Sequence, residues 1–315
     1  MQYERLGRTN LQVSVAGLGC GGHSRLGQAY GNTEQQSREV VAAALDAGVT
    51  FIDTAAAYRT ESIVGEALVG KRHGVVISTK TAVRTRDADS AEARFLTGSE
   101  ITARLEDSLR RLQTEYVDVY NMHGILLDEL DYVHDALLPT LLELKRQGKI
   151  RHLGITERFV SDTAHHMLPR ALAADAWDVI MVGFNLLNPS ARERVLKPAI
   201  AADIGVQIMF AVRRALSNPE ALRETLAEAV AQGQLPTDQS DALAKVLQAS
   251  GAASLTELAY RFCRHEPGAH VILTGTGKVE HLLANLEAIC GPPLPSATRD
   301  ALASLFGTVD CISGN

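Results

Sequence analysis

Four side chains capable of acid–base chemistry stand at or beside the ends of apolar runs. Asp53 ends the run in FIDTAAAYRTES, Tyr58 follows it, Lys80 ends VVISTK and His123 ends VDVYNMH. A phenol can exchange a proton with a carbonyl or alcohol oxygen, and a nearby ammonium stabilises the phenolate. A carboxylate keeps that ammonium charged and oriented, while an imidazole can hydrogen-bond the carbonyl. Each residue alone has an ordinary structural explanation, but together they predict proton transfer at a carbonyl.

The elements that must position these residues are short β-branched runs alternating with helical stretches. The expected strands lie at 15–21, 50–55, 75–80, 117–123, 152–156, 179–185, 205–210 and 270–275. Between them, spacings such as Ile101, Leu105, Leu109 and Leu112 are typical of an amphipathic helix. Continuously apolar strands joined by helices are parallel and buried on both faces. The pattern therefore favours a single (β/α)8 TIM barrel over residues 1–315. The alternative is an open, doubly wound sheet in two halves, but no linker divides the chain near its middle.

Local signals mark several element ends. Thr33 followed by Gln36 predicts a capping box at a helix start. We expect Gly48, Gly148 and Gly205 to end helices in the left-handed conformation that glycine adopts readily.

Three segments depart from the alternation. Residues 3–14 predict a hairpin in front of the barrel, which could plug one end. Residues 217–267 contain three helical patterns before the eighth strand, more than one crossover needs. The tail beyond Cys290 contains three prolines (Pro292, Pro293 and Pro295), and we expect it to be irregular.

In a parallel barrel the loops after the carboxyl ends of the strands build the active site. The four acid–base residues then converge on one mouth of the barrel. Here a resemblance becomes specific: FIDTAAAYRTESIVGEAL resembles the aldo-keto reductase signature of an aspartate, a tyrosine and a Gly-x-Ala-Leu helix. STK at 78–80 and NMHG at 121–124 fall where that family keeps its lysine and histidine.

This resemblance covers nearly the whole chain and implies a barrel that binds NADP(H), with NAD(H) possible. Hydride would pass between the nicotinamide and the carbon of a small-molecule carbonyl or alcohol substrate. Tyr58 would be the general acid or base, with Asp53, Lys80 and His123 as its partners.

The stretch LTGTGKVEHLLANLEA (273–288) runs from the last strand through glycines into a helix, whose free N–H groups and dipole favour an anion. The resemblance implies that Thr276, Lys278 and His281 face the 2′-phosphate of the adenosine and that Asn285 faces the adenine. Gly275 is also expected to bind the cofactor. Many family members carry arginine where this chain has His281, and Lys278 supplies a cation nearby.

At the nicotinamide end the chain departs from the family pattern. The Ser-Asn pair and the Gln that usually hold the carboxamide correspond to Thr156, Glu157 and Met181. An ionised Glu157 cannot donate a hydrogen bond, and Met181 offers mainly apolar contact. These departures keep open an alternative function, a regulatory subunit that binds the cofactor and senses redox state.

Two further features lie in the first and seventh loops. The ring-stacking aromatic of the family aligns with Ala211, beside Phe210, and Arg213 and Arg214 follow where a loop covers the pyrophosphate. The sequence GLGCGG at 17–22 matches a Rossmann pattern but does not open a helix, so its glycines more simply allow close passage of the first loop.

Composition limits the possible partners, location and metal sites of the protein. The formal net charge is −6 and Lys/Arg blocks are absent, which argues against nucleic acid and anionic membranes as partners. The charged start lacks the apolar core of a signal peptide, so we expect a cytoplasmic protein. Four dispersed cysteines signal neither a disulfide framework nor a metal site, and we expect none. A monomer and a homo-oligomer both remain open.

Overall fold

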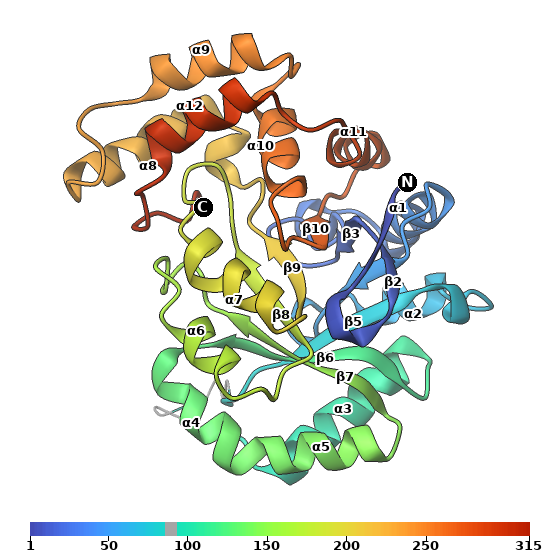
Figure 1. Cartoon of the computed structure of the whole chain (residues 1–315). Coiled ribbons are helices and arrows are strands. Elements are labelled where there is room, and N and C mark those ends of the chain that lie inside the picture. The colour runs from blue at the N-terminus through green and yellow to red at the C-terminus, as the bar shows by residue number, and fades with distance from the viewer. Residues whose placement is uncertain (86–92) are drawn as a thin grey trace.

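Eight parallel strands close into a barrel at the centre of the computed structural model, which describes residues 1–85 and 93–315 (Figure 1). Each strand pairs with the next in the chain, and the last closes on the first. The strands are β3 (Ala16–Gly19), β4 (Phe51–Asp53), β5 (Val76–Thr81), β6 (Val117–Ile125), β7 (Ile150–Glu157), β8 (Val179–Gly183), β9 (Gly205–Met209) and β10 (Val271–Thr274). The predicted (β/α)8 barrel and its eight strands are confirmed.

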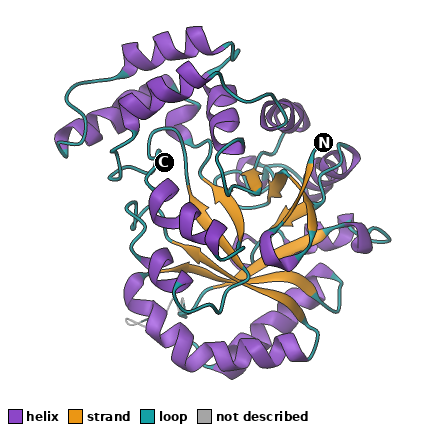
Figure 2. Cartoon of the chain, in the orientation of Figure 1, coloured by secondary structure: helices purple, strands orange, loops and turns teal. Residues whose placement is uncertain are grey.

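Helices surround the barrel (Figure 2). They are α1 (Glu34–Asp46), α2 (Glu61–Ala67), α3 (Gly98–Leu112), α4 (Leu130–Tyr132), α5 (Leu138–Arg146), α6 (Met167–Leu172), α7 (Lys197–Ala201) and α11 (Val279–Ile289). The four predicted apolar positions of α3 are all buried, since they lie on the face that meets the barrel. The predicted capping box is also present at the start of α1.

The glycine predictions are confirmed at two of three positions. Gly48 and Gly148 have φ angles of 86° and 77°. The prediction for Gly205 is wrong, because Asp203, with φ of 51°, makes the left-handed turn instead. Gly205 is needed for space: a Cβ there would lie 2.8 Å from a side-chain carbon of Leu6.

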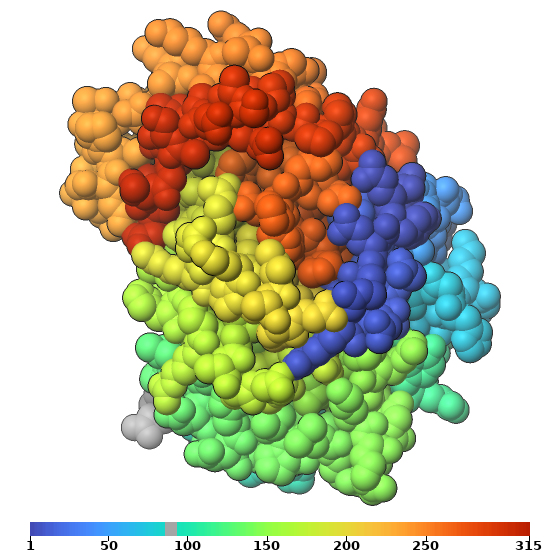
Figure 3. Space-filling view, in the orientation of Figure 1, coloured from blue at the N-terminus to red at the C-terminus, as the bar shows by residue number. Residues whose placement is uncertain are grey.

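The N-terminal hairpin of β1 (Tyr3–Arg5) and β2 (Gln12–Ser14) closes the amino-terminal end of the barrel, as predicted. Leu6 and Val13 are fully buried there against inward-pointing barrel residues. In the space-filling view this N-terminal segment lies between the surfaces of α7 and α2 (Figure 3).

Inward-pointing side chains form layers along the barrel, each built from alternate strands. The layer that meets the hairpin is apolar and consists of Phe51, Val119, Val179 and Val271. Two residues further along the same strands, the side chains that point inward are Asp53, Asn121, Met181 and Leu273. The interior therefore changes from apolar to partly polar toward the carboxyl ends of the strands.

Three helices separate β9 from β10, as the sequence predicted. They are α8 (Pro219–Ala231), α9 (Ser240–Ser250) and α10 (Leu255–Arg264). The tail is not wholly irregular, which corrects the prediction: α12 (Ser296–Phe306) begins directly after Pro295 and packs against α9 (Figure 1). All three prolines precede the helix, so none breaks it.

No helix in the described part of the chain combines the length and apolar character that a membrane span requires.

Helix α2 is held close to the barrel by its first residue and by a glycine. The buried carboxylate of Glu61 accepts hydrogen bonds from Thr79 Oγ1 on β5 (2.6 Å) and from Arg111 Nε on α3 (2.8 Å). A Cβ on Gly65 would lie 2.5 Å from the backbone oxygen of Arg111. The glycine of the signature therefore allows α2 and α3 to touch through their backbones.

We expect Gly65→Ala to lower the free energy of unfolding by about 2 kcal/mol, because this steric cost exceeds the helix propensity gained by alanine. Urea unfolding would measure it. Gly74→Ala is the matched control, since nothing lies within 4 Å of a Cβ at Gly74. Equal stability of the two variants would contradict the close packing of α2 on α3.

Candidate active site

A cavity of about 980 Å³ opens at the carboxyl ends of the barrel strands. It is near the upper end of the ~300–1,000 Å³ typical of small-molecule sites. The loops after β3, β9 and β10 and the helix α11 form most of its wall, and Asp53 and Tyr58 also line it. This is the end of a parallel barrel where active sites form.

A buried ion pair lies beneath this cavity. Lys80 Nζ donates to Asp53 Oδ2 at 2.6 Å and to the backbone oxygen of Thr54 at 2.9 Å. Burial raises the pKa of the Asp53 carboxyl, and the Lys80 ammonium opposes that rise. Burial by itself would lower the pKa of Lys80, but the charges of Asp53 and Tyr58 outweigh it and raise the pKa. Lys80 is therefore held as an ammonium.

Tyr58 stands above this pair on a short 3-10 turn, Ala56–Tyr58, that follows β4. Lys80 Nζ lies 4.8 Å from the centre of the phenol ring, and the hydroxyl lies 3.3 Å from His123 Nε2. A Cβ on Gly21 would lie 2.3 Å from a ring carbon of Tyr58, so the first loop packs directly on the phenol. The structure thus brings together the four residues singled out from the sequence.

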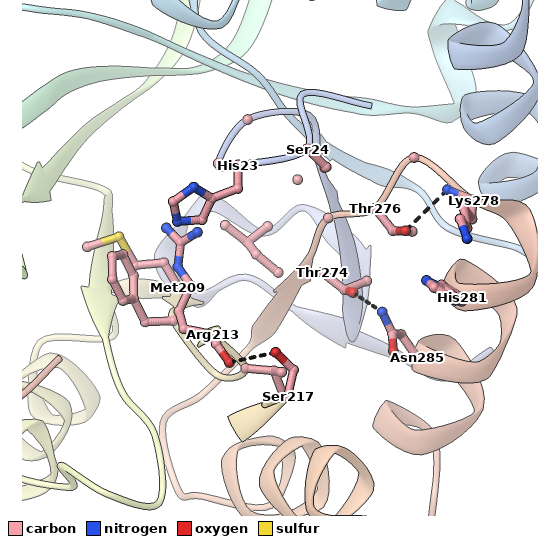
Figure 4. Close-up of a pocket in the computed structure, with 18 of the residues that line it drawn as sticks. His23, Ser24, Met209, Arg213, Ser217, Thr274, Thr276, Lys278, His281 and Asn285 are labelled. Carbon is pink, nitrogen blue, oxygen red and sulfur yellow. Dashed lines mark hydrogen bonds between the residues drawn. The ribbon is translucent and has the colours of Figure 1, made fainter. Parts of the chain in front are cut away.

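The five cofactor-binding residues expected after the last strand all line the cavity: Gly275, Thr276, Lys278, His281 and Asn285. Figure 4 shows Lys278 just before the start of α11, and His281 and Asn285 on that helix. Asn285 Nδ2 donates to Thr274 Oγ1 at 2.9 Å, which orients the amide. Lys278 lines the cavity and forms no ion pair with a carboxylate of the described residues, so its ammonium is available to an anion.

The three residues expected at the carboxamide are placed differently from one another. Met181 lines the cavity. Thr156 is buried, and its Oγ1 accepts from the backbone N–H of Gly124 at 2.7 Å. Glu157 lies outside the cavity wall: it is buried, within 2.9 Å of His165 Nδ1, and accepts from the backbone N–H of Gly183 at 2.7 Å.

Strand alternation explains why Glu157 does not reach the cavity. Successive residues of a strand point to opposite faces, so when Thr156 points inward Glu157 points outward. Burial raises the pKa of Glu157, and the neighbouring His165 imidazole opposes the rise. The sequence did not identify His165 as the partner of Glu157, because no motif or spacing marks this pair.

The seventh loop provides an aromatic wall and a cation. Phe210 lines the cavity in a left-handed conformation, with φ of 66°, which is uncommon for a bulky residue. The Arg213 guanidinium lies 4.0 Å from the centre of its ring. Arg213 forms no ion pair with a described carboxylate, and burial lowers its pKa. Arg214 also lines the cavity but contacts Glu224 at 3.4 Å.

The first loop contributes cavity residues that the sequence did not identify, including His23, Ser24, Tyr30 and Asn32. Figure 4 shows His23 and Ser24 in this loop. Asn32 Nδ2 donates to the backbone oxygen of Gly277 at 2.8 Å, so the first loop is joined to the eighth. Only the glycines at 17–22 gave a hint that this loop passes close to a ligand.

Comparisons with known proteins agree with this geometry. The model of the Aldo/keto reductase family matches residues 18–305. The chain is 31% identical to aldo-keto reductase YhdN of Bacillus subtilis, covering 97% of this chain and 94% of that protein. It is 26% identical to the uncharacterized oxidoreductase YqkF of the same organism, covering 96% of each. The holo form of aldo-keto reductase AKR11C1 from Bacillus halodurans is 25% identical and superposes with a TM-score of 0.75, covering 98% and 97% of the two chains.

The buried pairing of Glu157 with His165 makes a stability prediction. We expect His165→Asn, which retains tolerance of the left-handed φ of 59°, to destabilise the fold by about 3 kcal/mol because Glu157 loses its buried partner. Urea unfolding at neutral pH would measure it. His166→Asn is the adjacent control, because that histidine side chain is 69% exposed, and it should cost less than ~0.5 kcal/mol. A negligible effect at His165 would contradict this placement of Glu157.

Proposed function

Because the chain belongs to the aldo/keto reductase family, we propose that it is an NADP(H)-dependent oxidoreductase that interconverts an aldehyde or ketone and its alcohol. The observation that supports this most directly is the position of Tyr58. Its hydroxyl stands at the cavity between His123 and the buried Asp53–Lys80 pair.

The residues around the cavity fit a phosphate-bearing dinucleotide. The loop after β10 packs directly on the backbone at the end of β3, since a Cβ on Gly275 would lie 2.6 Å from the backbone oxygen of Gly19. Lys278 and Arg213 provide cations without carboxylate partners among the described residues, at the adenosine end and in the seventh loop. Lys278 and His281 would hold the 2′-phosphate, Asn285 the adenine and Arg213 the pyrophosphate.

A bound nicotinamide dinucleotide would supply the hydride for reduction or accept it for oxidation. The chain's own residues donate and accept the proton. In reduction, the Tyr58 hydroxyl gives its proton to the carbonyl oxygen, and the Lys80 ammonium stabilises the phenolate left behind. His123 Nε2 hydrogen-bonds the same oxygen and orients the carbonyl. In oxidation, the Tyr58 phenolate takes the proton of the alcohol.

The cofactor-binding regulatory subunit is the second candidate. It is favoured by the carboxamide positions, because Met181 is apolar and Glu157 is engaged by His165 and Gly183 outside the cavity. The complete acid–base group favours turnover instead, since binding alone needs no proton donor.

We expect Tyr58→Phe to lower kcat for NADPH oxidation at least ~100-fold over a panel of aldehydes and ketones, because the proton donor is removed. Cofactor affinity should be unchanged. Tyr3→Phe, at the opposite end of the barrel, is the matched control. Undiminished turnover in Tyr58→Phe would refute the mechanism, and cofactor binding by the parent without turnover of any carbonyl would favour the regulatory subunit.

For cofactor choice, we expect the parent to bind NADPH more tightly than NADH, and Lys278→Ala to weaken NADPH binding about tenfold with little effect on NADH. Calorimetry or fluorescence titration would measure both. Lys71→Ala removes an exposed lysine away from the cavity and controls for net charge. Equal affinity of the parent for the two dinucleotides would contradict the role of Lys278.

A further inference from the structure

Both oxygens of the Asp53 carboxylate are held by side chains of one neighbouring strand. Lys80 Nζ donates to Oδ2 at 2.6 Å, and Ser78 Oγ donates to Oδ1 at 3.0 Å. Ser78 and Lys80 lie two residues apart on β5, so both point into the barrel. The strand that supplies the ammonium therefore also fixes the carboxylate that orients it.

Asn121 on β6 determines which way the Ser78 proton points. Asn121 Nδ2 donates to Ser78 Oγ at 3.0 Å and to the backbone oxygen of Thr79 at 3.1 Å. A carbonyl oxygen can only accept, so the contact with Thr79 sets the orientation of the amide. A serine hydroxyl has a single proton. Since Asn121 donates to its oxygen, that proton is committed to Asp53.

The fold makes room for Asn121 at some cost. A Cβ on Gly154, its neighbour on β7, would lie 2.0 Å from Asn121 Oδ1, so only glycine leaves space for this amide. Asn121 is fully buried, and Oδ1 has no hydrogen-bond partner among the described residues. An unsatisfied buried acceptor lowers stability, and an apolar residue of the same size would avoid that cost. A contribution to stability therefore does not explain why an asparagine occupies position 121.

We propose that Ser78 and Asn121 are positioning residues that hold the Asp53 carboxylate in place and so set the strength with which the Lys80 ammonium acts on Tyr58. For its effect on turnover, this inference rests on the proposed function. Three other titratable groups face this cluster: Cys20 beside Asp53, and His123 and Arg213 beside Tyr58. Ser78 and Lys80 are the side chains that donate hydrogen bonds to Asp53 in the described part of the chain.

Removing the Ser78 proton has a defined electrostatic effect. Asp53 Oδ1 loses its donor, and more of the negative charge of the carboxylate is directed at Lys80. The ammonium then stabilises a phenolate at Tyr58 less well. A hydrogen bond to a charged group is strong enough that its loss corresponds to about a tenfold change.

The test compares full-length Ser78→Ala, Asn121→Leu and the double variant with the parent. Ser14→Ala is the matched control, because Ser14 is an equally buried serine that donates to the backbone of Ala16 at the hairpin end. We expect each single variant to lower kcat about tenfold with unchanged cofactor KM, and the double variant to lose no more than Ser78→Ala, because Asn121 acts through Ser78. Thermal unfolding should show Asn121→Leu at least as stable as the parent, which separates positioning from folding.

A second measurement needs neither substrate nor cofactor. The near-ultraviolet absorbance of the Tyr58 phenolate, obtained as the difference between each protein and its Tyr58→Phe counterpart, is followed against pH. We expect the phenolate to form at a higher pH in Ser78→Ala and Asn121→Leu than in the parent, by about one unit, the shift that corresponds to a tenfold change. If Ser78→Ala does not fold, Asn121→Leu decides the matter.

The inference is overturned if both variants keep the parental phenolate titration, or if the double variant loses the product of the two single effects. A parent that reduces no carbonyl would defeat the proposed function, while the phenolate titration would still decide the roles of Ser78 and Asn121.

Discussion

The buried contact between Lys80 and Asp53 is the constraint on which the rest of the site depends. Two charges removed from water are costly unless each finds enough hydrogen-bond partners. Here the pairing of β4 with β5 brings the two strands into register, and Thr54 and Ser78 add the further contacts. The result is an ammonium fixed beneath a phenol. Tyr58 needs only a short turn after β4 to reach its place above it.

Much of this arrangement could be predicted from the sequence, because parallel strands order their ends. Once eight strands were recognised, Asp53, Lys80 and His123 had to meet at one mouth of the barrel. The details that escaped depend on side-chain direction. Glu157 follows Thr156 directly, and one step along a strand turned it away from the cavity toward His165. No pattern in the sequence specifies whether the last residue of a buried strand points into the barrel or away from it.

Other features that the sequence did not predict lie in loops and in contacts between distant segments. The left-handed turn before β9 is made by Asp203 and not by Gly205, and the glycine instead leaves space for the side chain of Leu6 from the hairpin. The first loop supplied much of the cavity wall, joined to the eighth loop by Asn32. Such contacts join segments far apart in sequence and depend on backbone placement, which composition and periodicity do not encode.

The layered interior separates two tasks along the barrel axis. Phe51, Val119, Val179 and Val271 pack against the hairpin, and none of the four lines the cavity. Leu273 of the cavity wall packs against this layer, and the polar positions Asp53 and Asn121 lie two residues further along the strands of Phe51 and Val119. Substitutions at the closed end therefore affect the stability of the fold and leave the cavity lining unchanged. Sequence drift, or engineering for heat resistance, can accumulate there while the loops at the open end diversify toward new substrates, so the barrel can evolve at its two ends independently.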